Sequence, residues 1–140
     1  MKISADDKLV ELYIDGVEVN GLPNRYNYWA ADSVPLPQTA QTIAVWVNNT
    51  EGIGGLLASS KLIISDDTWK VATEYTAGWM SVTFDDGDWN NATVYRMNKD
   101  NSSSFVVSAI SSSAAWISTN DRTNSVVYFR YRINYCDEMS

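Results

Sequence analysis

The side chains best suited to chemistry in this sequence are three pairs of adjacent aspartates: Asp6-Asp7, Asp66-Asp67 and Asp85-Asp86. Neighbouring carboxylates provide the hard oxygen ligands that Ca²⁺ prefers, and a bound cation offsets their mutual repulsion. The second and third pairs precede Trp69 and Trp89, so we expect an aspartate of each to cap a turn while the tryptophan packs into the core. Asp6-Asp7 is different because it lies just before a strong strand pattern, at the expected rim of a sheet.

A second group of polar side chains follows the strand predicted over 42–48. If this strand runs antiparallel beside the strand predicted over 9–14, its carboxy-terminal end lies next to Asp6-Asp7. The rim then holds Ca²⁺ or binds a sugar's vicinal hydroxyls directly, with an aromatic ring from Tyr26, Tyr28 or Trp29 over the sugar. The alternative is a rim of Asx turns with solvated charges. The candidate ligand-binding residues are Asp6, Asp7, Asn48, Asn49, Glu51, Tyr28 and Trp29.

No histidine occurs in the chain. Its absence removes the commonest general base, the usual metal ligand and every Ser-His or Cys-His nucleophile. Two carboxylates at a fixed separation can still hydrolyse a glycosidic bond, but no pair is singled out for that reaction. We therefore predict a protein that is not an enzyme, and keep a glycosidase as a third hypothesis.

The net charge of −7 repels both nucleic-acid phosphates and acidic lipid surfaces. No run of about eighteen apolar residues is available for membrane insertion, and residues 1–4 lack the apolar stretch of a secretion signal. Three sequons, beginning at Asn48, Asn91 and Asn101, would accept glycans in a secretory pathway. We expect no nucleic-acid partner, no membrane insertion, and an extracellular or cell-surface location, with the cytoplasm as the alternative.

Strand patterns recur along the chain, whereas no stretch keeps apolar residues at helical spacing. In the clearest strand, 9–14, we expect Val10, Leu12 and Ile14 to share the buried face. Asp15-Gly16 predicts a two-residue hairpin turn with a return strand at 17–19. Segment 20–41 contains all three prolines and is predicted to cross the surface with at most a short strand.

Further strands are predicted from alternating or β-branched runs, at 42–48, 62–64, 70–73, 80–84, 105–110 and 125–135. In the first of these, Ile43, Val45 and Val47 share one face. No linker or repeat divides the 140 residues, so we expect one domain over 1–140. The predicted fold is all-β, with two antiparallel sheets packed as a β-sandwich.

Most of the chain resembles galactose-binding-like jelly-roll modules, with features of PA14-type domains. The matching segments are SADD from Ser4, LYIDG from Leu12, IAVWV from Ile43, GGLL from Gly54, DTWKV from Asp67, FDDGDWNNA from Phe84, WI from Trp116 and YFR from Tyr128. Such modules are attached to rhamnosidases and β-galactosidases and stand alone in some lectins. In the attached modules the FDD and YFR segments usually precede SADD. Here they follow it, so the resemblance implies a circularly permuted jelly roll.

The resemblance also implies a site. In PA14-type adhesins an Asp-Asp pair linked by a cis peptide holds a Ca²⁺ that holds the sugar, which points to Asp6 and Asp7 as metal ligands. The first hypothesis is therefore a non-catalytic lectin for galactose-like sugars on glycans or glycoproteins. Crosslinking, as in a hemagglutinin, needs more than one site, so we expect a homodimer, with the single Cys136 as a candidate link. The alternative is a structural or protein-interaction module without sugar binding.

Overall fold

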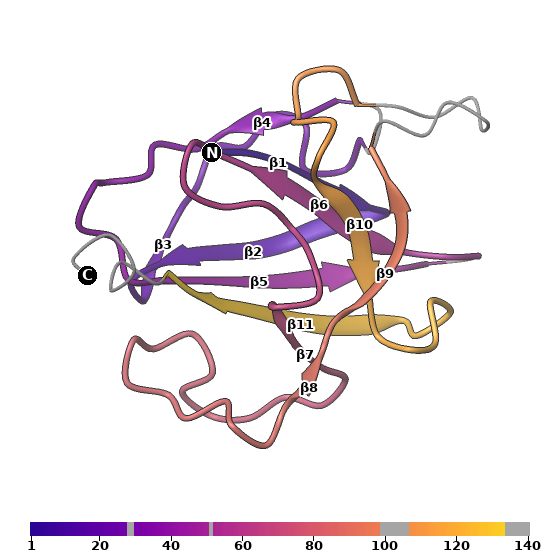
Figure 1. Ribbon diagram of the computed structural model, residues 1–140. Coiled ribbons are helices and arrows are strands. Elements are labelled where there is room, and N and C mark those ends of the chain that lie inside the picture. The colour runs from indigo at the N-terminus through magenta and orange to yellow at the C-terminus, as the bar shows by residue number, and fades with distance from the viewer. Residues whose placement is uncertain (28–29, 51, 99–106, 134–140) are drawn as a thin grey trace.

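The computed structural model describes residues 1–27, 30–50, 52–98 and 107–133. In these ranges the chain forms two antiparallel sheets and no helix. One sheet has five strands, in the order β4 (Asp32–Ser33), β1 (Lys2–Asp6), β6 (Gly55–Ser59), β10 (Ala115–Ser118) and β9 (Thr93–Met97). The other has six, in the order β3 (Val17–Glu18), β2 (Lys8–Ile14), β5 (Thr42–Asn48), β11 (Val126–Arg132), β7 (Lys70–Ala72) and β8 (Asn90–Asn91). The predicted all-β sandwich is confirmed (Figure 1).

The main core lies between the two sheets and is built from alternate residues of the central strands. Ile43, Val45 and Val47 of β5 are all buried, as their alternation predicts. They meet inward residues of the five-stranded sheet, such as Ile3 and Ile117. Full burial of each such aliphatic side chain stabilises the fold by roughly 1.5–3 kcal/mol, so this layer holds the two sheets together.

The prediction of which β2 residues share the buried face is wrong at one position. Leu9 pairs with Val47 and Glu11 pairs with Trp46, which leaves Val10 as an extra residue in a β-bulge. The bulge shifts the alternation by one residue. As a result Leu9, and not Val10, joins Leu12 and Ile14 in the core.

The predicted hairpin after β2 is confirmed. Asp15 and Gly16 both adopt positive φ, 53° and 79°, as a two-residue turn of this kind requires. β2 then pairs with the short return strand β3. The Asp15 carboxylate also accepts hydrogen bonds from the backbone N–H groups of Gln41 (2.7 Å) and Thr42 (2.9 Å), which ties the turn to the start of β5.

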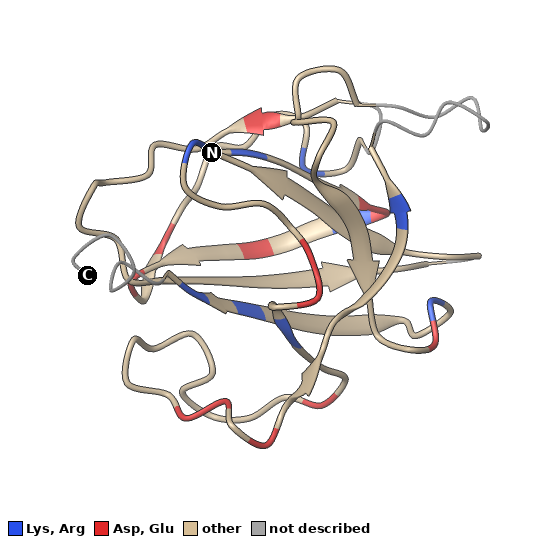
Figure 2. Cartoon of the chain, viewed as in Figure 1, with Lys and Arg blue, Asp and Glu red and all other residues tan. Residues whose placement is uncertain are grey.

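The strand predicted over 80–84 is also wrong, because this segment belongs to a long turn-rich connection between β7 and β8. The connection crosses the outer face of the six-stranded sheet, where Trp79 packs against Tyr128. Its carbonyl groups bond to the buried Arg130 of β11 and not to a neighbouring strand. Figure 2 shows the acidic turns of this connection below the six-stranded sheet, whose strand β11 carries basic residues.

Two other predicted strands are replaced by turns. In 62–64 the Ser60 hydroxyl accepts hydrogen bonds from the N–H groups of Leu62 and Ile63, and only Ile64 makes an isolated bridge. In 105–110 the last four residues form a turn held by the Asn98 side chain, and the first two lie outside the described residues. Sequence patterns missed β1, β6, β8, β9 and β10.

Candidate functional site

Asp6 and Asp7 form the corner at which the chain passes from one sheet to the other. β1 ends at Asp6 in the five-stranded sheet and β2 begins at Lys8 in the six-stranded sheet. The peptide bond between the two aspartates is cis. Asp6 pairs with Gly55, the first residue of β6, so the loop before β6 lies beside the same corner.

Asp7 is held against the end of β5, as predicted. Its backbone N–H donates to the Asn48 carbonyl (3.1 Å), and its Oδ2 accepts from both the N–H (2.9 Å) and the hydroxyl (2.8 Å) of Thr50. Asn48 thus reaches the corner through its backbone. Thr50 was not among the predicted residues, although a hydroxyl two positions after the strand is a usual partner for a nearby carboxylate.

Asn49 carries the least expected feature of the corner. Its side chain is only 6% exposed. The Nδ2 donates to the carbonyls of Gly52 (2.7 Å) and Arg122 (3.2 Å). The Oδ1 is buried and, within the described part of the chain, accepts no hydrogen bond. A buried acceptor without a partner costs free energy, so this oxygen is suited to an external donor or cation.

Gly54 brings Asn49 and Asp6 together. A Cβ at this position would lie 2.8 Å from the Asp6 carbonyl oxygen and 2.9 Å from the Asn49 Cβ. Only a glycine allows so close an approach. The Asn49 side chain and the Asp6 backbone therefore flank one point on the loop, and Asp7 is the next residue along the chain.

Electrostatics at the corner favour a shared proton or a cation. Partial burial raises the pKa of Asp6 to about 7, and both the hydrogen bond to the Asp7 carboxylate and its charge act in the same direction. Arg122 opposes them by a smaller amount. Two carboxylates this close resist simultaneous ionisation, and a divalent cation removes that resistance.

Arg122 is a further residue that sequence patterns missed. Its Nε donates to the Gly54 carbonyl (3.0 Å), and its guanidinium lies 4.6 Å from the centre of the Tyr95 ring. Burial lowers the pKa of Arg122. Its role is to fasten the loop between β10 and β11 to the loop before β6.

The predicted aromatic partners are only partly placed. Glu51, Tyr28 and Trp29 lie outside the described residues. Tyr26 is 65% exposed, and Lys8 Nζ is 5.5 Å from the centre of its ring. Lys8 follows Asp7 directly in the chain, so its side chain connects the corner to this exposed ring, which Arg25 also contacts at 5.9 Å.

The other two aspartate pairs have the structural role predicted for them. Asp66 Oδ1 accepts from the Thr68 N–H (2.9 Å) in the turn before the buried Trp69. Asp85 Oδ1 accepts from the Gly87 N–H (2.9 Å) in the turn before Trp89. Trp89 departs from the prediction, because it is half-buried on the outer face beside Phe84 and not in the main core.

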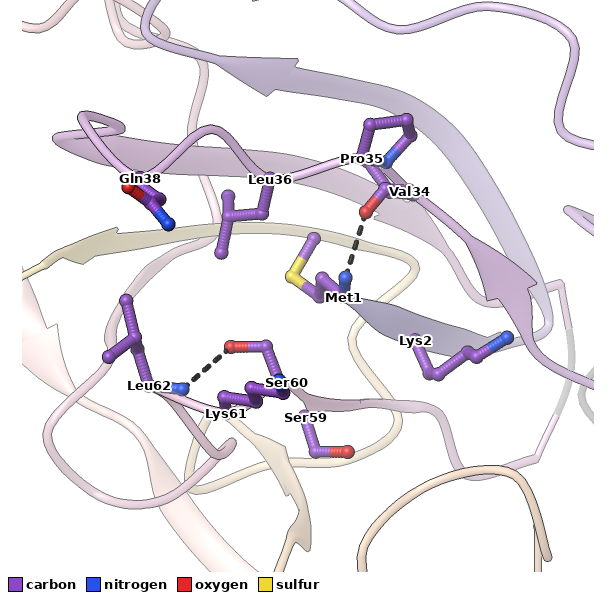
Figure 3. Close-up of a pocket in the computed structure, with 10 residues that line it drawn as sticks. All are labelled: Met1, Lys2, Val34, Pro35, Leu36, Gln38, Ser59, Ser60, Lys61 and Leu62. Carbon is purple, nitrogen blue, oxygen red and sulfur yellow. Dashed lines mark hydrogen bonds between the residues drawn. The ribbon is translucent and has the colours of Figure 1, made fainter.

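An apolar groove of about 740 Å³ lies at the far end of β1 and β6 from the corner. The pairing of β1 with β6 separates the two sites, because Lys2 pairs with Ser59 at the groove and Asp6 pairs with Gly55 at the corner. Figure 3 shows its wall, where the Met1 amine donates to the Val34 carbonyl (2.8 Å) and the Leu62 N–H to the Ser60 hydroxyl (3.1 Å). This groove contributes nothing to the candidate site.

The corner can hold a cation only with a mixed set of oxygens. Within the described ranges, no three His, Cys, Asp or Glu side chains gather as a metal site. The candidate donors are the Asp6 and Asp7 carboxylates and the Asn49 amide oxygen. A set of carboxylate and amide oxygens suits Ca²⁺ better than softer metals.

Comparison of the chain with protein-family models, with curated proteins and with solved structures gave no match. Among the described residues, none belongs to a helix with the length and apolar character needed to cross a membrane.

Proposed function

We propose that this protein is a non-catalytic carbohydrate-binding protein, a lectin, which holds Ca²⁺ at the Asp6–Asp7 corner and recognises galactose-like sugars there. The observation that carries the proposal is the buried Asn49 Oδ1, which lacks a hydrogen-bond partner among the described residues and belongs to the loop that Asp7 holds. The proposal assigns this oxygen and the two carboxylates as ligands of the Ca²⁺. The galactose-like preference comes from the resemblance of the sequence alone.

The chemistry of such a site follows from the coordination of Ca²⁺. This ion takes about six to eight oxygen ligands, more than Asp6, Asp7 and Asn49 supply. Backbone carbonyls, water and two vicinal sugar hydroxyls would complete the shell. The exposed ring of Tyr26 can then pack against the apolar face of the sugar, as aromatic rings at binding surfaces commonly do.

The geometry does not favour a glycosidase built on the same pair. Glycosidase carboxylates stand on either side of the scissile bond, about 5 Å or more apart. Asp6 and Asp7 are adjacent in the chain, and their carboxyl groups are close enough to share a hydrogen bond. Hydrolysis of a chromogenic galactoside that disappears in the Asp7→Asn variant would revive this third hypothesis.

A glycan array with and without a chelator tests the proposal, together with calorimetric titration of Ca²⁺. In Asp7→Asn we expect Ca²⁺ affinity to fall at least about tenfold and sugar binding to weaken, without unfolding, because asparagine still accepts hydrogen bonds from Thr50. Asp88→Asn is the matched control, since this exposed aspartate lies far along the chain in the β7–β8 connection.

Unchanged affinity in Asp7→Asn would remove the corner from consideration. Absence of glycan binding with and without chelator would favour the alternative, a structural or protein-interaction module. Chelator-sensitive binding that Asp7→Asn abolishes and Asp88→Asn retains supports the lectin. Gel filtration with and without a reductant tests the homodimer and its link through Cys136, which lies outside the described residues.

A further inference from the structure

A polar groove of about 560 Å³ lies where the edges of the two sheets meet. β8 is the edge strand of the six-stranded sheet and β9 is the edge strand of the five-stranded sheet. The loop over 119–124 joins β10 to β11 and closes the groove on the other side. The wall therefore contains residues from both sheets.

Neutral amide and hydroxyl groups dominate the lining, which includes Asn90, Asn91, Thr93, Asn120 and Asn124, with the Asp121 carboxylate as the charged group. No lysine or arginine is among the described lining residues, and a carboxylate disfavours a phosphate or sulfate. Few apolar groups line it, which disfavours a hydrophobic ligand. Amides and hydroxyls that both donate and accept suit a neutral polyhydroxylated molecule.

The groove is held in shape by its own hydrogen bonds. The Thr119 hydroxyl donates to Asn124 Oδ1 (2.6 Å), and Asn91 Nδ2 donates to the Asp67 carbonyl (2.9 Å). Asn90 and Asn120 are exposed, and neither side chain makes a hydrogen bond within the described part of the chain. Their amides are therefore available to a ligand, on a wall whose other members are already held in place.

The same loop also borders the Asp6–Asp7 corner. The Arg122 carbonyl accepts from the Gly54 N–H (2.9 Å) and from Asn49 Nδ2 (3.2 Å). Residues 119–121 and 124 line the groove, whereas Arg122 between them contacts the corner. One loop therefore separates two places at which hydroxyl groups can bind.

We propose that this groove is a second carbohydrate subsite, which binds the further residues of a neutral oligosaccharide whose terminal sugar occupies the Asp6–Asp7 corner. The inference rests on the proposed function and adds the ligand class: an oligosaccharide of several neutral residues, bound more tightly than a single sugar. Hydrogen bonds from Asn90 and Asn120 supply the additional affinity.

Calorimetry with D-galactose and β-1,4-galactotetraose, at saturating Ca²⁺, tests this inference. The protein is made in a bacterial host, so that Asn91, the first residue of a sequon, carries no glycan. We expect the tetrasaccharide to bind the unchanged protein about tenfold more tightly than galactose, since hydrogen bonds to neutral groups each contribute modestly. The Asn90→Ala/Asn120→Ala double variant should lose that difference and keep its galactose affinity.

Asn20→Ala, another exposed asparagine outside the groove lining, is the control and should retain the difference. Unchanged tetrasaccharide affinity in the double variant overturns the second subsite and leaves the proposed function intact. Loss of binding of both sugars in Asp7→Asn, with the groove unaltered, identifies the corner as the primary site.

If the unchanged protein binds neither sugar, the galactose preference fails, and the groove is judged separately by NMR. Galactotetraose, cellotetraose and maltotetraose are added in turn to the unchanged protein, and the side-chain amide signals of Asn90, Asn120 and Asn124 are followed. Shifts confined to these amides support the subsite. No shift with any of the three sugars overturns it.

Discussion

The Asp6–Asp7 corner and the β7–β8 connection both contain adjacent aspartates, but the fold treats their charges differently. In the connection, Asp86 Oδ2 forms an ion pair with Nε of the buried Arg130 (2.9 Å). At the corner, the Asp6 carboxyl faces the Asp7 carboxylate, and Arg122 offsets their repulsion only in part. A carboxylate paired with a buried cation supports the structure, whereas a carboxyl with a raised pKa, in a corner where a buried amide oxygen accepts no hydrogen bond from the described residues, is suited to an external cation.

The largest effect is expected in the β7–β8 connection, where Arg130 pairs with Asp86. Arg130 is 1% exposed and also donates to the carbonyls of Trp79 (2.6 Å) and Ser81 (3.0 Å). Arg130→Met should lower the free energy of unfolding by about 3–5 kcal/mol, because it leaves a partly buried carboxylate and buried carbonyls without partners. Urea denaturation measures this.

Arg132→Met is the control for that variant. The Arg132 side chain donates to the Val82 carbonyl (3.0 Å) from an exposed position, so its loss should cost less than about 1 kcal/mol. Equal losses of stability in the two variants would show that the buried Arg130 does not hold the β7–β8 connection in place.

A smaller effect is expected from Gly54→Ala at the Asp6–Asp7 corner. The new methyl group would meet the Asp6 carbonyl oxygen at 2.8 Å, and this backbone atom cannot rotate away. We expect a loss of about 1–3 kcal/mol of stability and a loss of Ca²⁺ affinity, measured by denaturation and calorimetry.

Gly87→Ala is the matched change in the other acidic turn. Its nearest neighbour is a carboxylate oxygen of Asp85 at 3.0 Å, the end of a side chain, so we expect little change in stability. Retained Ca²⁺ affinity in Gly54→Ala would show that the contact between Asp6 and Asn49 is not needed for the site.

The smallest effect is the change in stability with pH, measured on protein from which a chelator has removed Ca²⁺. The pKa of Asp6 is raised from its usual 3.8 to about 7 in the folded state. Between those values the folded protein binds more protons than the unfolded chain, so stability falls as pH rises from about 4 to 7. Because Asp6 is partly exposed, solvent screening limits the change to about 1 kcal/mol.

Denaturation curves at pH 4, 5, 6 and 7 measure this slope, which Asp6→Asn should remove. Saturating Ca²⁺ should abolish or reverse it, since the ion binds the deprotonated carboxylates. A slope that is the same in the variant and the unchanged protein would place the titrating group elsewhere.

Local patterns predicted much of the fold and one part of the site. The alternation of Ile43, Val45 and Val47 identified β5, and antiparallel pairing with β2 placed Asp7 beside Asn48. The bulge at Val10 was not predictable, since a one-residue shift depends on the partner strand. The prediction of a strand over 80–84 was wrong because this alternating segment packs on the outer face of a sheet and does not pair with a neighbouring strand.

The sequence by itself determined the all-β class, the hairpin at Asp15-Gly16 and the position of an acidic pair at the end of β5. These depend on residues close together in the chain or on a repeated spacing. Contacts between distant segments give Asp86 a buried cation as its partner and place the Asp6 carboxyl beside the Asp7 carboxylate. Arg130 meets Asp86 and Arg122 contacts Gly54 across 44 and 68 positions of the chain, and no local pattern reports contacts of that separation.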